Sequence, residues 1–263
     1  MAEKTPVHFF DLLSEVPGKS WSPNTFKTRM VLNYKSIPYT ESYISYPDIA
    51  PLLRSLSVPP GDGHVEYTLP AIIHPSVTSN PNGALMDSLD IALHLDEQCP
   101  EKTLFPSGDA SYALAIAVEK IMYDVSFTGV TLIMTAITDK LDPRGREFYT
   151  ETRTVRFGKP LSEVRPTDEG EIREIVERMK RTIKPIVKML KGKGEKRGPF
   201  FEGETPGYAD LVLTSFLAWY WVVEQGVWRE LLDLGDGELK ALWNACFPWV
   251  EGKGKEKEWE VPK

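Results

Sequence analysis

The sequence contains few cysteines and histidines. Its 263 residues include two cysteines, Cys99 and Cys246, which lie far apart and form neither a disulfide framework nor a Cys-x-x-Cys pair. The four histidines, at positions 8, 64, 74 and 94, show no metal-ligand spacing, and neither cysteine lies beside one of them. The histidine and cysteine spacing predicts a protein without a metal site. The low cysteine content also indicates a reducing compartment, which we expect to be the cytoplasm.

The sequence also lacks a long uninterrupted apolar run and an excess of positive charge. The most apolar helix-length stretch, residues 113–137, contains Glu119, Lys120 and Asp124, and the N-terminus has no apolar signal region. Lys and Arg number 31 against 38 Asp and Glu, a formal charge of −7 that disfavours binding to phosphate backbones. We therefore expect a soluble protein with neither membrane nor nucleic acid as a partner.

What the chain does contain is ordinary globular composition. Apolar residues make up 41% and charged residues 26%, which argues against a disordered or fibrous chain. A chain of this length can bury a substantial core as one large domain or as two smaller ones.

The first hundred residues alternate between strand and helix patterns. The order βαβα-ββα predicts a mixed four-stranded sheet with helices on its faces, and Asn80-Pro81-Asn82-Gly83 is a hairpin turn signal. The first two strands should be parallel, because a helix connects them. We expect strands near residues 7–10, 39–44, 69–74 and 84–86, and helices near 23–35, 49–56 and 88–98.

Beyond Pro100 only helix-length apolar patterns occur. Residues Ala115, Val118, Met122 and Val125 fall on one helix face, and two further helix patterns follow over 172–190 and 211–223. The sequence thus predicts an α/β domain over residues 1–104 and an all-helical domain over 105–263. The Lys- and Glu-rich tail from Gly252 should be mobile or loosely attached.

Three short motifs carry the chemical interpretation. Ser22-Pro23 is a helix start with proline in the first turn, Leu69-Pro70 opens a short strand, and Asp87-Ser88 opens a helix after a strand. Each motif alone is common in proteins and needs no function. The sequence leaves the isomer of the Leu69-Pro70 peptide bond open.

In this order the motifs resemble those of the glutathione transferases, and the resemblance covers nearly the whole chain. Ser22-Pro23-Asn24-Thr25 stands where thioredoxins have Cys-Pro-x-Cys, so the resemblance implies a thioredoxin-like first domain. Four further motifs are similar to the fungal FuA group, which is related to bacterial β-etherases: residues 21–24 together with 27–29, and residues 46–50, 67–70 and 156–159. That similarity implies binding of wood-derived polyphenols.

The resemblance also implies roles for individual residues. Ser22 would donate a hydrogen bond to the glutathione sulfur, with Asn24 as a possible second donor. Leu69, before Pro70, would pair with the cysteinyl peptide, Asp87 would meet the α-ammonium group, and Ser88 the α-carboxylate of glutathione. Lys35 is a weaker candidate for the glycyl carboxylate, with an exposed lysine at a helix end as the alternative.

The second substrate would occupy an apolar pocket. Trp21 flanks Ser22, and Tyr123 and Phe127 lie on the first helix after the linker, so we expect these three to contact an apolar aromatic ligand. The family resemblance further implies a homodimer. An enzyme acting on aromatic electrophiles and a carrier of aromatic compounds both remain open, and a structural or regulatory role is a third alternative.

One position departs from the family pattern. A later helix of the family often begins Ser/Thr-x-x-Asp, whereas here Gly207 precedes Asp210 by three residues. Glycine supplies no side-chain acceptor to a helix start, so the detail of this cap is expected to differ, with Thr205 as a candidate substitute.

Overall fold

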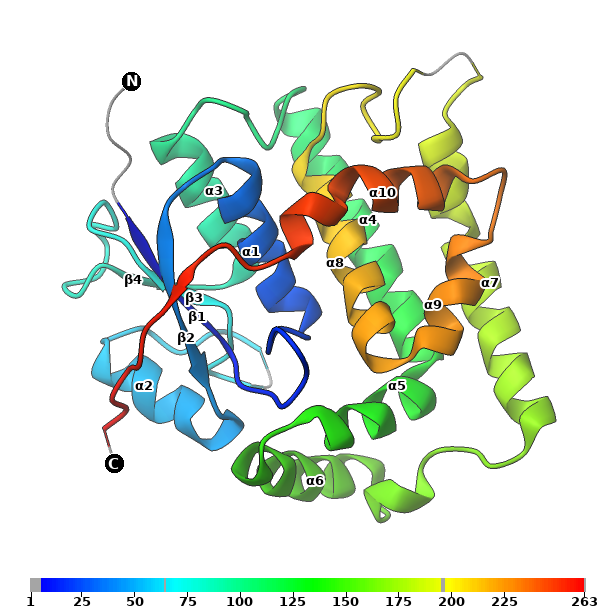
Figure 1. Cartoon of the computed structure of the whole chain (residues 1–263), viewed down its shortest axis with the longest axis horizontal. Coiled ribbons are helices and arrows are strands. Elements are labelled where there is room, and N and C mark those ends of the chain that lie inside the picture. The colour runs from blue at the N-terminus through cyan, green and yellow to red at the C-terminus, as the bar shows by residue number, and fades with distance from the viewer. Residues whose placement is uncertain (1–5, 64, 195–196, 263) are drawn as a thin grey trace. The chain divides into compact units, whose positions relative to one another are not determined.

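A computed structural model describes residues 6–63, 65–194 and 197–262 (Figure 1). The chain divides into two compact units. The sheet unit comprises the residues up to 103 together with 141–148 and those from 249 onward, and the helical unit comprises 104–140 and 149–248. Two segments late in the sequence therefore belong to the sheet unit.

The sheet unit opens with the expected parallel β-α-β arrangement. Strand β1 (Val7–Leu12) pairs with β2 (Tyr39–Ile44), and the helix α1 (Pro23–Tyr34) connects them. All six residues of β1 are buried, as expected for a central strand covered on both faces. Proline in the first turn of α1 fits because that backbone position needs no hydrogen-bond donor.

The second half of the sheet is an antiparallel hairpin. Strands β3 (Ala71–Ile73) and β4 (Ala84–Met86) pair with each other, and β3 also pairs antiparallel with β1. At the hairpin turn Gly83 has φ of +67°, and a Cβ there would lie 2.8 Å from the His74 carbonyl oxygen, so only glycine fits.

Two further helices complete the predicted mixed sheet unit. They are the short helix α2 (Ile49–Ser55), which follows the 3-10 turn η1 (Tyr46–Asp48), and helix α3 (Ser88–Gln98).

The expectation of a loosely attached tail is wrong. Residues Lys255–Glu256 form strand β5, which pairs in parallel with β2 and makes the sheet order β4-β3-β1-β2-β5. In Figure 1 the red C-terminal chain runs along β2. A two-residue strand has no detectable alternation, and only tertiary pairing reveals it.

The helical unit has the expected all-helical character. Helices α4 and α8 carry its core: α8 is buried along most of its length, and α4 packs against both α7 and α8. Within the described residues the segments after the sheet are α4 (Asp109–Thr128), α5 (Val130–Ile137), η2 (Thr138–Lys140), α6 (Pro143–Phe157), η3 (Leu161–Glu163), α7 (Glu169–Lys191), α8 (Tyr208–Val223), α9 (Gln225–Leu232) and α10 (Glu238–Val250).

The apolar stretch 113–137 is two helices and not one. The chain bends at Gly129, where a Cβ would lie 2.3 Å from the Met179 sulfur. Across the described ranges no single helix has the length and apolar composition needed to cross a membrane. Helix α4 and the segment Val130–Lys140 satisfy both criteria only as a pair bent by 83°.

Helix α8 begins without a capping hydroxyl. The buried Asp210 carboxylate accepts hydrogen bonds from the backbone N–H of Gly207 (2.8 Å) and of Phe201 (2.9 Å). The acidic half of the family's cap is therefore present, and it satisfies two buried backbone donors without a contribution from Thr205.

Candidate functional site

The register of the sheet brings the three sequence motifs to one edge. Ala71, the first residue of β3, pairs with Phe10 near the end of β1 and with Met86 at the end of β4. The Leu69-Pro70 pair before β3, the Asp87-Ser88 pair after β4 and the loop from β1 to α1 therefore all emerge at this edge. The carboxyl ends of parallel strands, with the N-termini of the helices that follow them, are a common place for ligands.

Ser22 precedes the first turn of α1 with an extended backbone, φ −79° and ψ 135°. Its hydroxyl makes no capping hydrogen bond to the helix, although its carbonyl accepts from Phe26 N at 3.0 Å. The residue as a whole is 5% exposed. A hydroxyl that is not used for capping can donate to an anion at the positive end of the helix dipole.

Asn24 and Lys27 form a pair across the first turn of α1. The Lys27 ammonium donates to Asn24 Oδ1 at 2.9 Å, and the Lys27 side chain is fully buried. This contact fixes the orientation of the half-buried Asn24 amide. Sequence reasoning missed Lys27, because a lysine in a helix is exposed in most proteins.

The Leu69-Pro70 peptide bond, whose isomer the sequence left open, is cis. Leu69 and Pro70 are buried, and Leu69 stands just before the ladder of β3. The adjoining Asp87 has φ of +82°, a conformation that costs an ordinary residue about 1–3 kcal/mol and is concentrated at functional sites.

The Asp87-Ser88 pair begins α3 at the same edge. Asp87 is exposed, and its Oδ1 accepts from Leu89 N at 2.8 Å, while Ser88 is the buried first residue of the helix. Partial burial and the neighbouring Asp87 charge raise the pKa of Asp90. This concentration of negative charge favours a bound ammonium group.

The expectation for Lys35 is wrong in both of its alternatives. Lys35 follows the last turn of α1, so the whole helix, about 18 Å long, separates it from the Ser22 end. Its side chain is fully buried, and the ammonium pairs with Asp96 at 2.6 Å and donates to the carbonyls of Cys99 and Lys102. Lys35 therefore joins the ends of α1 and α3 and is not available to a ligand.

Trp21 begins a row of aromatic side chains within the sheet unit. Its ring centroid lies 6.3 Å from that of Tyr46, and Tyr46 stacks on Phe148 at 6.2 Å. Trp21 is buried, and its Nε1–H has no hydrogen-bond partner in the described chain. The contact between Tyr46 and Phe148 was not predicted from sequence, because the two residues lie about a hundred residues apart and meet only in the folded chain.

The first turn of α6 is anchored to the sheet unit by polar contacts. Arg144 makes a bidentate ion pair with Asp48, with distances of 2.8 and 2.7 Å, and Ser45 donates to Asp142 at 2.8 Å. These contacts hold the start of α6, and with it Phe148, against the rest of the sheet unit.

The other two predicted pocket residues, Tyr123 and Phe127, belong to α4 of the helical unit. Tyr123 is 45% exposed and makes an edge-to-face contact with Phe216 at 5.3 Å, while Phe127 is 71% exposed. Large exposed aromatic side chains on a helix are available for apolar ligands or partners.

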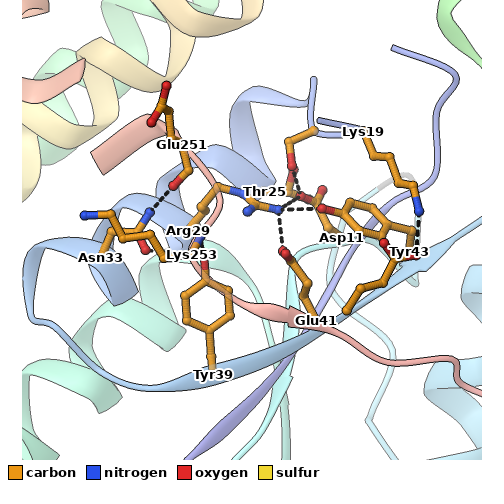
Figure 2. Close-up of polar contacts among 12 residues, drawn as sticks. Asp11, Lys19, Thr25, Arg29, Asn33, Tyr39, Glu41, Tyr43, Glu251 and Lys253 are labelled. Atoms are coloured by element: carbon orange, nitrogen blue, oxygen red, sulfur yellow. Dashed lines mark hydrogen bonds and ion pairs between the residues drawn. The ribbon is translucent and has the colours of Figure 1, made fainter. Parts of the chain in front are cut away.

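A buried charge network is centred on Arg29 of α1 (Figure 2). The Arg29 guanidinium, 1% exposed, binds Asp11 of β1 at 2.9 Å and Glu41 of β2 at 2.6 Å, and also reaches the Tyr43 hydroxyl at 3.2 Å. Asp11 Oδ2 also accepts from the Ser20 hydroxyl at 2.6 Å. The network thus connects β1, α1, β2 and the loop that carries Ser22.

The titration shifts follow from this burial. Burial lowers the pKa of Arg29, but Asp11, Tyr39, Glu41 and Tyr43 raise it by more, so the guanidinium stays charged. Burial raises the pKa of Tyr43 to about 12, with the Arg29 charge opposing the shift. Both groups therefore keep one protonation state over the physiological range.

Within the described residues, no group of three or more His, Cys, Asp or Glu side chains is placed to hold a metal ion. His74 and His94 share a hydrogen bond of 2.8 Å, but two residues do not make a metal site of the usual size. His64 lies outside the described residues.

Two family models together match most of the chain. The glutathione S-transferase N-terminal domain model matches residues 21–98, and the C-terminal domain model matches 113–249. The chain is 55% identical over 267 residues to the glutathione S-transferase-like protein ustS of Aspergillus flavus, with 99% of this chain and 97% of that protein covered.

Two solved fungal structures are similar over nearly the whole chain. A glutathione S-transferase of Ceriporiopsis subvermispora, solved in complex with glutathione, is 27% identical with a TM-score of 0.82, covering 92% of this chain and 97% of that one. Glutathione transferase GSTFuA2 of Phanerochaete chrysosporium is 26% identical with a TM-score of 0.81, covering 95% and 100%.

The buried network predicts a large stability effect. Arg29→Met leaves two buried carboxylates without their partner, so we expect it to lower the free energy of unfolding by about 3–5 kcal/mol. Urea unfolding at neutral pH, followed by tryptophan fluorescence, measures the change. Arg144→Met is the matched control, because the Arg144 side chain of its bidentate pair is exposed, and the loss of stability should be far smaller. Equal losses in the two variants would contradict the account.

Proposed function

The chain belongs to the glutathione S-transferase family, and on that premise we propose that Ser22 stabilises the thiolate of bound glutathione for attack on apolar aromatic electrophiles or ethers. The observation that carries this proposal is the Ser22 hydroxyl, which stands at the N-terminus of α1 and makes no capping bond. Glutathione is the co-substrate, and the proposed chemistry requires no metal.

The energy needed for this chemistry is modest. A free thiol has a pKa of about 8.5, and lowering it to about 6.5 requires roughly 2.7 kcal/mol of differential stabilisation. A hydrogen bond to a charged group contributes about 1.5–3 kcal/mol, and a helix N-terminus contributes roughly 0.3–2 kcal/mol. The two together suffice. A serine also leaves the sulfur free, whereas a cysteine would form a mixed disulfide.

The rest of the glutathione molecule would occupy the same edge of the sheet. Leu69, next to cis-Pro70 and outside the β3 ladder, offers its backbone to the cysteinyl peptide as an added strand. Asp87 would bind the α-ammonium group, and Ser88 with the N-terminus of α3 would receive the α-carboxylate. Lys35 has no place in this scheme, because its ammonium is committed elsewhere.

The aromatic side of the site begins at Trp21. The row Trp21, Tyr46 and Phe148 offers ring faces and edges on the sheet unit, and Tyr123 and Phe127 are the candidates on the helical unit. We propose polyphenols as one ligand class, because the sequence resemblance to the FuA group implies them and two FuA structures are similar to this chain. A carrier that holds such compounds with little turnover is the alternative function, and it would use the same aromatic residues.

We further infer a homodimer in the cytoplasm. The family resemblance supports the dimer, and the two free, buried cysteines agree with a reducing compartment. Light scattering at micromolar concentration should give twice the chain mass of 29.7 kDa. A monomeric mass would refute the dimer.

Asp87→Ala should weaken glutathione binding by about 1.5–3 kcal/mol, because it removes the carboxylate that pairs with the α-ammonium group. Isothermal titration calorimetry measures this change. Asp168→Ala is the matched control, since Asp168 is likewise an exposed carboxylate that accepts from the first turn of a helix. Affinity that is unchanged in Asp87→Ala would remove Asp87 from the site.

Ser22→Ala should raise the pKa of bound glutathione toward the free value and shift the pH profile of turnover to higher pH. Loss of a charge-assisted bond predicts a roughly ten- to hundredfold lower rate at neutral pH, with polyphenol affinity nearly constant. Thiolate absorbance, titrated for wild type, Ser22→Ala and Asn24→Ala, measures the pKa directly.

Ser55→Ala controls for the loss of a hydroxyl, because Ser55 donates only to its own helix. A wild-type pKa equal to that of free glutathione, unchanged in both site variants, would reject the catalytic role. A tight polyphenol complex under those conditions would then favour the carrier.

A further inference from the structure

The C-terminal segment Glu251–Trp259, here called the strap, is fastened along the outer edge of the sheet (Figure 1). Asn33 Nδ2 donates to the Glu251 carbonyl at 2.6 Å, Lys253 N donates to the Tyr39 hydroxyl at 3.0 Å, and Lys257 N donates to the Glu41 carbonyl at 2.8 Å. Trp259 stacks on His8 at 4.7 Å. The strap therefore has attachments along its whole length.

The strap backbone lies against the buried charge network, and Figure 2 shows Glu251 and Lys253 of the strap near Arg29. A Cβ at Gly252 would lie 2.3 Å from Arg29 Nη1 and 3.6 Å from Glu41 Oε1, so the strap backbone rests on the guanidinium. A few residues on, the strap pairs with Glu41 itself through β5. Keeping water away from Arg29 and Glu41 strengthens their interaction, because the local dielectric constant falls.

The network in turn holds the loop that carries Ser22. Arg29 and the Ser20 hydroxyl bind the same oxygen of Asp11, at 2.9 and 2.6 Å, and the other oxygen accepts from Leu12 N at 2.7 Å. A second connection is direct, because Lys19, the residue before Ser20, pairs with Glu256 of the strap. Two separate paths thus run from the strap to the residues just before Ser22.

From this arrangement we propose that the strap is a positioning element of the thiol site: it fixes the Lys19–Ser22 loop through Arg29 and Asp11 and thereby sets the hydroxyl of Ser22. The proposal rests on the function proposed for Ser22, but the fixing of the loop is a separate mechanical claim. The strap touches neither sulfur nor substrate in this scheme, and it acts only through the network and through the pair that Glu256 makes with Lys19.

Gly252→Ala tests the proposal with one added methyl group. The methyl would displace the strap from Arg29, so hydrogen exchange of residues 18–22 should become about tenfold faster, together with that of the strap. The pKa of bound glutathione should rise and kcat at neutral pH should fall, with KM for glutathione changing little, since Asp87 and Ser88 are not touched. Glu256→Gln, which weakens the Lys19 pair, should produce a smaller effect of the same sign.

The control is Lys255→Ala, which removes an exposed side chain from the same strap. In this variant the hydrogen exchange of residues 18–22 and the pKa of bound glutathione should match those of wild type. Loop exchange at the wild-type rate in Gly252→Ala, with faster exchange in the strap, would overturn the proposal. So would a loosened loop with an unshifted thiol pKa. If wild-type protein does not lower the thiol pKa at all, the proposed function fails, and loop exchange still decides whether the strap fixes the loop.

Discussion

The fold of the sheet unit depends on one buried cation. Arg29 lies between Asp11 and Glu41 with almost no exposure, and a guanidinium in such a place is tolerated only if its partners are held close and water is excluded. This requirement fixes α1 against β1 and β2. It also explains why glycine occupies position 252, where any side chain would meet the guanidinium.

The same constraint reaches the proposed chemistry through Asp11. A hydrogen bond to a thiolate stabilises it fully only when the donor is already in position. If the hydroxyl is mobile, the conformational entropy lost on ordering it offsets part of the free energy of the bond. Ser22 precedes the first turn of a helix whose second turn carries Arg29, and its loop is tied to Asp11 through Ser20. The buried network around Arg29 therefore both holds the sheet unit together and keeps the proposed thiol donor, Ser22, in position.

Local patterns in the sequence were sufficient for the central sheet, the hairpin turn and the helix that begins at Pro23, because each has its own propensity signal. They also singled out Ser22, Leu69-Pro70 and Asp87-Ser88 as local motifs, whose role in the site stays a prediction. Lys35 was misplaced, since no local pattern shows that a lysine is buried beside Asp96. Strand β5 and the meeting of Tyr46 with Phe148 are products of tertiary packing, and residues that far apart leave no periodic signal.

The most direct test of the central claim is a crystal structure of this protein with reduced glutathione bound. The account predicts the sulfur within hydrogen-bonding distance of the Ser22 hydroxyl, the γ-glutamyl group at Asp87 and Ser88, and the cysteinyl backbone paired with Leu69. A sulfur atom held by another side chain, with Ser22 facing away from it, would contradict the account.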